Sequence, residues 1–103
     1  MTEWIKIAEI GEIGPGERKF FDIDGEPAAL FNVDGQYYAI ADVCTHDDGP
    51  VAEGVLDGYA IECPRHGARF DIRTGAVLSF PAIVPIPTYQ VKVAEDGIYV
   101  ARP

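Results

Sequence analysis

Cysteine and histidine are scarce in this sequence, which has two of each among its 103 residues. So few cysteines exclude a disulfide-rich scaffold. Positive charge is also scarce, because 8 Lys and Arg residues face 17 Asp and Glu residues and leave a net charge of −9. Nucleic acids and anionic membranes bind basic surfaces. We therefore expect neither as a partner.

Long hydrophobic runs are absent as well, and no stretch approaches the roughly 20 apolar residues of a membrane-spanning helix. The first residues, Met1-Thr2-Glu3-Trp4, lack the basic and apolar regions of a secretory signal. We therefore expect a cytoplasmic protein, where reducing conditions favour metal ligation by the two cysteines over a disulfide. The length allows one modest core, which predicts a single domain over residues 1–103.

Short runs rich in β-branched and aromatic residues predict an all-β fold, since no helical period extends beyond about two turns. Asp24-Gly25 and Asp34-Gly35 are typical of tight hairpin turns with positive φ. Glu95-Asp96-Gly97 predicts a hairpin loop of three to five residues, and that closing hairpin is expected to return to the opening strand. A short turn over residues 10–14 is the one helical candidate. Strands are expected at residues 4–10, 18–23, 28–33, 37–41, 89–94 and 98–101.

The two cysteines and two histidines form two short pairs. Cys44 and His46 give the pattern C-x-H, Cys63 and His66 give C-x-x-H, and residues 47–62 separate the pairs. A Cys₂His₂ zinc site uses the same ligands, but it usually groups the cysteines together and the histidines together. A nucleophilic cysteine is a further alternative, with Cys63 activated by His66 or His46, but it leaves the other pair unexplained.

The pairs and their surroundings resemble the Rieske [2Fe-2S] proteins, most closely the soluble ferredoxins of bacterial aromatic-ring dioxygenase systems. The resemblance implies a Rieske fold, in which an antiparallel β-sandwich base carries an inserted cluster-binding subdomain at about residues 42–80. Respiratory members of the family carry a membrane anchor and an extra cysteine pair, and this sequence has neither. The motifs that carry the resemblance are Cys44-Thr45-His46, Gly54-Val55-Leu56-Asp57-Gly58, Glu62-Cys63-Pro64-Arg65-His66-Gly67, Phe70-Asp71, Arg73-Thr74-Gly75 and Pro81-Ala82.

The resemblance also implies the ligands of one [2Fe-2S] cluster. Cys44 and Cys63 would bind one iron, and His46 and His66 would bind the other, exposed iron. Exposed imidazoles that lose a proton at alkaline pH would make the reduction potential fall as pH rises. Pro81 matches a proline loop that covers the cluster in the family.

Two positions near the second pair predict a low reduction potential. High-potential members have a serine and a tyrosine where this sequence has Ala68 and Phe70, so two hydroxyl donors to the cluster are missing. Asp47 and Asp48 add negative charge beside the first pair, although such loop acids are more often simply solvated. We predict a potential of about −150 mV, at the bottom of the Rieske range.

The implied function is one-electron transfer from a flavin reductase to a terminal oxygenase or a similar acceptor, by a monomer that is not itself an enzyme. Arg65 and Arg69 are candidate partner contacts, although surface arginines are usually unspecific. Two alternatives stay open. One is the small Rieske-like subunit of a nitrite reductase, and the other is a zinc-stabilised interaction module.

Overall fold

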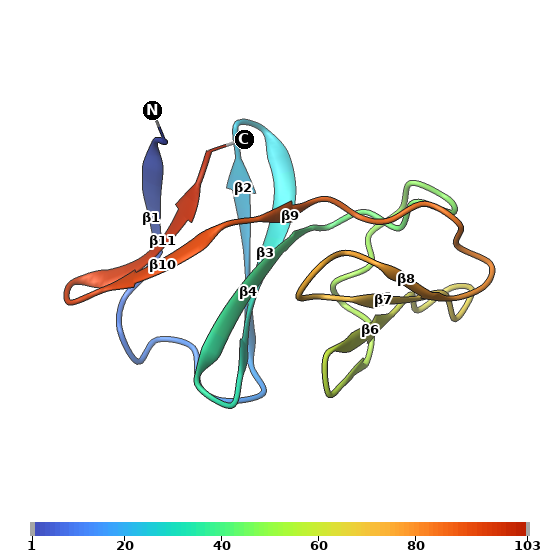
Figure 1. Ribbon diagram of the computed structural model, residues 1–103, viewed down its shortest axis with the longest axis horizontal. Helices are drawn as coiled ribbons and strands as arrows, with labels where there is room; N and C mark the ends of the chain where they lie inside the picture. The colour runs from blue at the N-terminus through green and yellow to red at the C-terminus, as the bar shows by residue number, and fades with distance from the viewer. Residues whose placement is uncertain (1, 103) are drawn as a thin grey trace.

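Three antiparallel sheets follow one another along the long axis of the molecule (Figure 1). The structure is a computed structural model that describes residues 2–102 and measures 40 × 28 × 18 Å. The described residues contain strands and turns but no helix, so none of them forms an apolar helix that could cross a membrane. The expected all-β fold is confirmed. The helical candidate at residues 10–14 is instead part of a turn, in which the Glu12 N–H donates to the Glu9 carbonyl at 3.2 Å.

The first sheet joins the two ends of the chain. Its strands, in spatial order, are β1 (Trp4–Ala8), β11 (Gly97–Ala101) and β10 (Val91–Ala94). The closing hairpin therefore returns to the opening strand, as expected. Its turn is shorter than predicted, because Ala94 pairs with Gly97 and leaves only two residues between the strands. Gly97 belongs to β11, where a Cβ would lie 2.8 Å from the Ala8 carbonyl oxygen.

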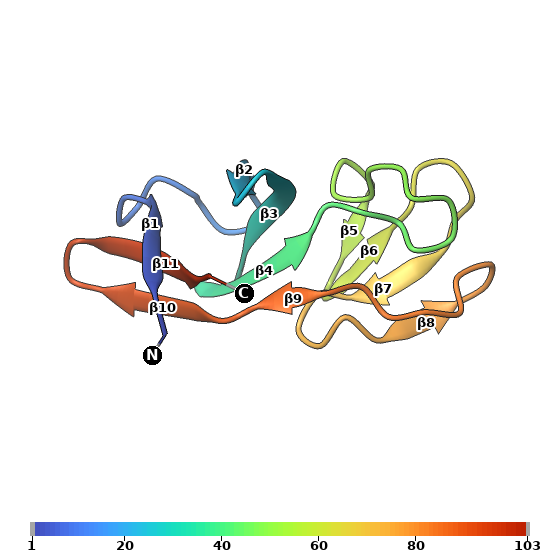
Figure 2. The ribbon, with the colours of Figure 1, turned by 90° about the horizontal axis from the view of Figure 1, so that it is seen from above.

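The second sheet occupies the middle of the molecule. Its strands are β2 (Arg18–Ile23), β3 (Glu26–Val33), β4 (Gln36–Ala41) and β9 (Thr88–Tyr89). Both predicted tight turns form, with positive φ at Asp24 and Gly25 (53° and 82°) and at Asp34 and Gly35 (53° and 87°). The predicted strand at 89–94 was wrong in one respect, because the chain leaves the second sheet after β9 and enters the first sheet as β10 (Figure 2).

The opening strand is also shorter than predicted. It ends at Ala8 rather than at residue 10, because the chain turns at residues 9–12, and Ile10 is 52% exposed. Apolar alternation alone could not reveal that turn.

The third sheet lies at the end of the molecule away from both termini (Figure 1). It is built from short hairpins, which place the intervening loops close together. Its strands, in order, are β5 (Leu56–Asp57), β6 (Ala60–Glu62), β7 (Arg69–Asp71) and β8 (Val77–Ser79).

Strand β3 is buried on both faces and separates two apolar cores. Ala28 and Leu30 face the core shared with the first sheet, whereas Ala29 and Phe31 face the core shared with the third sheet. This double burial explains the continuous apolar run in β3, where a strand with one wet face would alternate. Burial of each large apolar side chain contributes about 1.5–3 kcal/mol. Both cysteines belong to the core shared with the third sheet.

Candidate metal centre

The four predicted ligands lie on two loops beside the third sheet. The first ligand loop (residues 44–49) follows β4, and the second ligand loop (residues 63–68) joins β6 to β7. In each loop the cysteine N–H donates to the carbonyl five residues later, at 2.6 Å in the first and 2.7 Å in the second. The cysteine carbonyl accepts the N–H four residues later, at 2.7 and 3.0 Å. The two loops therefore hold their cysteines in the same way.

Both loops need a left-handed residue four positions after the cysteine. That residue is Asp48 in the first loop, with φ 61°, and Gly67 in the second, with φ 73°. Glycine adopts this conformation freely, and aspartate is among the few other residues that tolerate it. The left-handed residue turns the chain back, so that each loop closes on its cysteine.

The two thiols are buried and adjacent. Cys44 is 0% exposed and Cys63 is 1% exposed, and no disulfide joins them. Burial is the main cause that raises the pKa of the Cys44 thiol, while the backbone N–H groups of His46 and Asp47 act in the opposite direction. A buried thiolate is stable only beside a cation or metal. This pair of sulfurs is therefore suited to metal ligation.

The two imidazoles lie together on the surface. The rings of His46 and His66 meet edge to face, with centroids 4.9 Å apart. The His66 side chain is 44% exposed, and its Nε2 lies 3.2 Å from Asp47 Oδ2. Because Nε2 faces a carboxylate, Nδ1 is the nitrogen left for a metal.

The donor arrangement fits two metal ions better than one. Tetrahedral zinc, with bonds of about 2.0–2.3 Å, would draw all four ligand atoms within about 4 Å of one another. Among residues 2–102, the structure gathers only Cys44, Asp47 and Cys63 into a group with donor atoms within 4.8 Å of each other. Neither histidine joins that group. Paired buried thiols and paired exposed imidazoles match a [2Fe-2S] cluster that takes two thiolates on one iron and two imidazoles on the other.

Asp47 is in that group of three but is not free to bind a metal. Its Oδ2 accepts from Arg65 Nε at 2.6 Å, and its Oδ1 accepts from Arg65 Nη2 at 2.9 Å and from the Gly49 N–H at 3.0 Å. The interaction with Arg65 is the main cause that lowers the pKa of the Asp47 carboxyl far below its usual range. Asp47 is thus neither a simply solvated acid nor an uncompensated charge, which corrects both sequence-based interpretations. Asp47 and Arg65 are eighteen positions apart in the sequence, and no local sequence pattern indicates the pair.

The surroundings of the thiols lack side-chain hydroxyls at the two positions noted in the sequence. Ala68 and Phe70 are both 0% exposed and belong to the same core as the cysteines. Neither can donate a hydrogen bond to a sulfur through its side chain. These two side chains therefore supply no hydroxyl donor, and the low potential stays a prediction.

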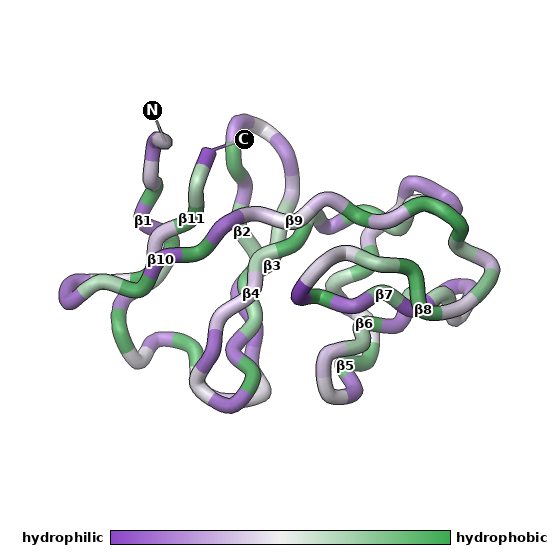
Figure 3. The backbone as a smooth tube through the Cα atoms, viewed as in Figure 1, coloured by the Kyte–Doolittle hydropathy of each residue, from purple (hydrophilic) through white to green (hydrophobic). Residues whose placement is uncertain are grey.

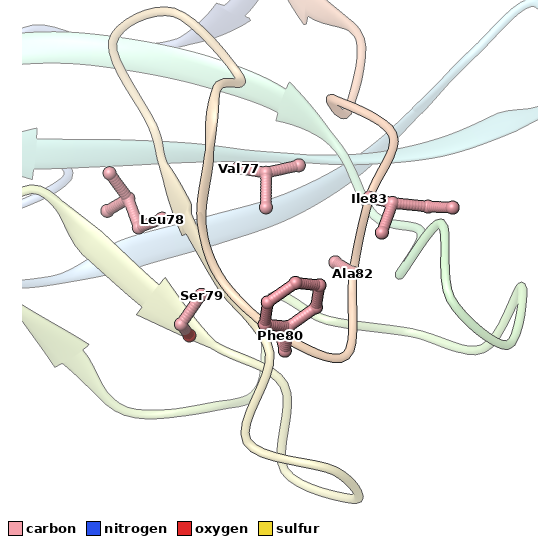
Figure 4. Close-up of a pocket in the computed structure, with 6 residues that line it drawn as sticks. All are labelled: Val77, Leu78, Ser79, Phe80, Ala82 and Ile83. Atoms are coloured by element: carbon pink, nitrogen blue, oxygen red, sulfur yellow. The ribbon is translucent and has the colours of Figure 1, made fainter.

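A third segment, residues 80–87, lies beside the first ligand loop. Thr45 Oγ1 donates to the Val84 carbonyl at 2.5 Å, which places the predicted proline loop next to a ligand pair. The segment carries exposed apolar side chains that the sequence analysis did not single out, and it forms hydrophobic stretches in Figure 3. Phe80 is 82% exposed and Ile83 is 77% exposed. Both line a shallow hollow of about 340 Å³ (Figure 4).

An all-β scaffold with two buried thiols and two exposed imidazoles on paired loops defines an iron–sulfur protein of mixed Cys/His ligation. Comparison with known families agrees, because the Rieske [2Fe-2S] domain matches residues 3–90. The chain belongs to the Rieske [2Fe-2S] family.

Individual relatives define the class more closely. The chain is 45% identical over 101 residues to the 3-phenylpropionate/cinnamic acid dioxygenase ferredoxin subunit of Shigella boydii, covering 96% of this chain and 93% of that protein. It is 39% identical over 99 residues to ferredoxin CarAc of Metapseudomonas resinovorans, covering 95% and 92%. Among solved structures, the ferredoxin of carbazole 1,9a-dioxygenase from Nocardioides aromaticivorans superposes with a TM-score of 0.91 at 33% identity, covering 97% and 98%.

These relatives are ferredoxins, so this chain is an electron carrier rather than an enzyme, and its cofactor is a [2Fe-2S] cluster. Both expectations from the sequence are confirmed. The zinc module and the nucleophilic cysteine are set aside.

Proposed function

We propose that this ferredoxin carries one electron at a time from a flavin reductase to the terminal oxygenase of an aromatic-ring dioxygenase system. The exposed pair of imidazoles carries the proposal, because it would bring the edge of the cluster to the surface, where a partner protein can approach it closely. A related structure with 39% identity and a TM-score of 0.89 is a complex of reduced oxygenase and oxidised ferredoxin in carbazole 1,9a-dioxygenase. It supports a direct contact between the two proteins.

The cluster ligands in this proposal are Cys44 and Cys63 on one iron and His46 and His66 on the other. When bound, the cluster supplies a one-electron couple. The chain excludes water from the sulfurs by burying both cysteines and leaves the imidazoles at the surface. We assign residues 1–103 to one domain with a cluster-binding subdomain at about 42–80, a range that contains the third sheet and both ligand loops.

The docking surface in this proposal is the apolar segment beside the first ligand loop. Phe80, Ile83 and Val84 are 82%, 77% and 52% exposed, which suits a small transient interface with an apolar centre. The net charge of −9 favours a basic partner and predicts slower association at high salt. We place the protein in the cytoplasm as a monomer.

The first experiment is anaerobic purification followed by iron, sulfide and zinc analysis and by EPR after reduction with dithionite. Two irons, two sulfides and a rhombic signal support the ligand assignment, whereas one zinc per chain would contradict it. Stable co-purification with a large reductase subunit would contradict the free electron carrier and favour the small Rieske-like subunit of a nitrite reductase.

The docking surface is tested by electron transfer to a dioxygenase component in stopped flow. Ile83→Ser is expected to lower the second-order rate constant about tenfold, the equivalent of 1.4 kcal/mol. Val93→Ser is the matched control, since Val93 is 56% exposed on β10 in the first sheet. Equal rates for the two variants would contradict the assigned surface.

A further inference from the structure

One ion pair joins the two ligand loops. Arg65 lies between Cys63 and His66 in the second loop, and its guanidinium binds Asp47 of the first loop through two hydrogen bonds of 2.6 and 2.9 Å. A third hydrogen bond runs from Arg65 Nη1 to the Pro50 carbonyl at 2.7 Å. Such forked contacts fix the orientation of the carboxylate as well as its distance.

The guanidinium also packs against the first ligand loop. A Cβ on Gly49 would lie 2.7 Å from Arg65 Nη2 and 2.8 Å from Cζ, so the guanidinium lies directly against the backbone of the first loop. Asp47 also accepts the Gly49 N–H at 3.0 Å. The carboxylate is therefore held by both loops at once.

The same carboxylate reaches a proposed ligand. His66 Nε2 lies 3.2 Å from Asp47 Oδ2, which leaves Nδ1 to face the metal. Carboxylates that accept from the far nitrogen of a ligating histidine fix its ring orientation. Arg65 thus orients Asp47, and Asp47 orients His66.

We propose that Arg65 and Asp47 are positioning residues that act as one unit, the Asp47–Arg65 bridge, to hold the two ligand loops together and to orient the His66 ring for cluster binding. The proposal rests on the ligand set of the proposed function. Surface ion pairs are usually weak. This one differs because it joins two segments that must stay in register and contacts a ligand.

The test measures cluster loss from the holoprotein under an anaerobic chelator, followed by visible absorbance and released iron. Arg65→Gln and Asp47→Ala are each expected to speed the loss about tenfold, as for other groups that orient metal ligands. The effect of the double variant should be well below the product of the two single effects, because both single variants already remove the ion pair between Asp47 and Arg65. Rates that multiply to about 100-fold in the double variant would overturn the bridge.

The matched control is Arg73→Gln. Arg73 also makes a forked pair, with Asp71 at 3.1 and 2.8 Å, but the two residues lie two positions apart in one turn. The Arg73 guanidinium also lies over the Tyr59 ring, and it does not connect the two ligand loops. Its cluster should be lost at the wild-type rate. Equal loss rates in Arg65→Gln and Arg73→Gln would overturn the proposal, and a wild-type protein without a cluster would instead overturn the proposed function.

Two further readouts separate positioning from simple stability. Arg65→Lys keeps the positive charge but cannot form the two parallel hydrogen bonds. It should therefore retain the cluster better than Arg65→Gln but less well than the wild type. Retention equal to the wild type would contradict the role of the forked contact. The midpoint potential should fall in Arg65→Gln, because the Asp47 carboxylate beside His66 loses its cation, and it should not change in Arg73→Gln. An unchanged potential in Arg65→Gln would also contradict the arrangement. If Arg65→Gln does not fold, Asp47→Asn takes its place, because it keeps the size of the side chain but removes the charge that the guanidinium binds. Wild-type retention in that variant would overturn the bridge.

Discussion

The two ligand loops share a backbone conformation but almost no sequence. The first reads C-T-H-D-D-G and the second C-P-R-H-G-A, yet each closes on its cysteine with the same two hydrogen bonds. The cysteine sulfur is therefore placed by backbone geometry, which many sequences can form. The histidine is one residue farther along in the second loop, and its position depends on what lies around the loop.

The two loops differ most in the contacts that fix their ends to the rest of the fold. The second loop closes a hairpin, since Glu62 of β6 pairs with Arg69 of β7. The first loop has no such strand pair. Its exit is held by a side chain, because Asp42 Oδ1 accepts the N–H groups of Val51 and Ala52 at 2.9 and 2.8 Å. We infer that side-chain substitutions should affect the first loop more than the second.

A substitution of Asp42 tests that inference and should have the largest effect on stability. Asp42→Ala removes the acceptor of two hydrogen bonds to a partly buried carboxylate and should lower the free energy of unfolding by about 2–3 kcal/mol. Thermal unfolding of the holoprotein, followed by far-UV circular dichroism, measures the loss. Asp42→Asn keeps an acceptor oxygen at this position and should lose less. Equal stability of Asp42→Ala and wild type would mean that the first loop does not depend on this side chain.

The next comparison exchanges the left-handed residues. Gly67→Ala forces an alanine to φ 73°, at a cost of about 1–2 kcal/mol. Asp48→Gly relieves the strain of a side chain at φ 61° but adds backbone entropy to the unfolded chain, so its net effect should stay within about 0.5 kcal/mol. The pair is compared by melting temperature, where 1 kcal/mol corresponds to roughly 4–8 °C for a domain near this size. Destabilisation by Asp48→Gly as large as that by Gly67→Ala would show that the Asp48 side chain has a role of its own.

Most of the features that the sequence predicted depend on neighbouring residues. Asp24-Gly25 and Asp34-Gly35 form tight turns because two consecutive residues decide their φ values. The strand at Arg18–Ile23 has the predicted bounds because its alternation faces a single core. The two Cys/His pairs were found because each lies within four residues of chain.

The features that the sequence did not predict depend on distant parts of the chain. The fold brings Asp47 to Arg65 across eighteen positions, and no pattern in the sequence distinguishes Arg65 from an unspecific surface arginine. The change of sheet between β9 and β10 follows from where the partner strands lie, and nothing in residues 89–94 marks it. Gly97 was assigned to a turn, although its place is set by the approach of β1.

The smallest expected effect concerns the last position of the second loop. Ala68 is fully buried in the core that holds both cysteines, and the resemblance to high-potential family members places a serine hydroxyl there. A hydrogen bond of about 1 kcal/mol that favours the reduced cluster would raise the midpoint potential by about 40 mV, since 59 mV corresponds to a tenfold change for one electron. The midpoint potential of Ala68→Ser should therefore be higher than that of the wild type, which we predict to be about −150 mV. Protein-film voltammetry measures both potentials, and the melting temperature checks that packing is unchanged. A wild-type potential above about +100 mV, or a lower potential in Ala68→Ser, would show that groups other than this missing hydroxyl set the potential.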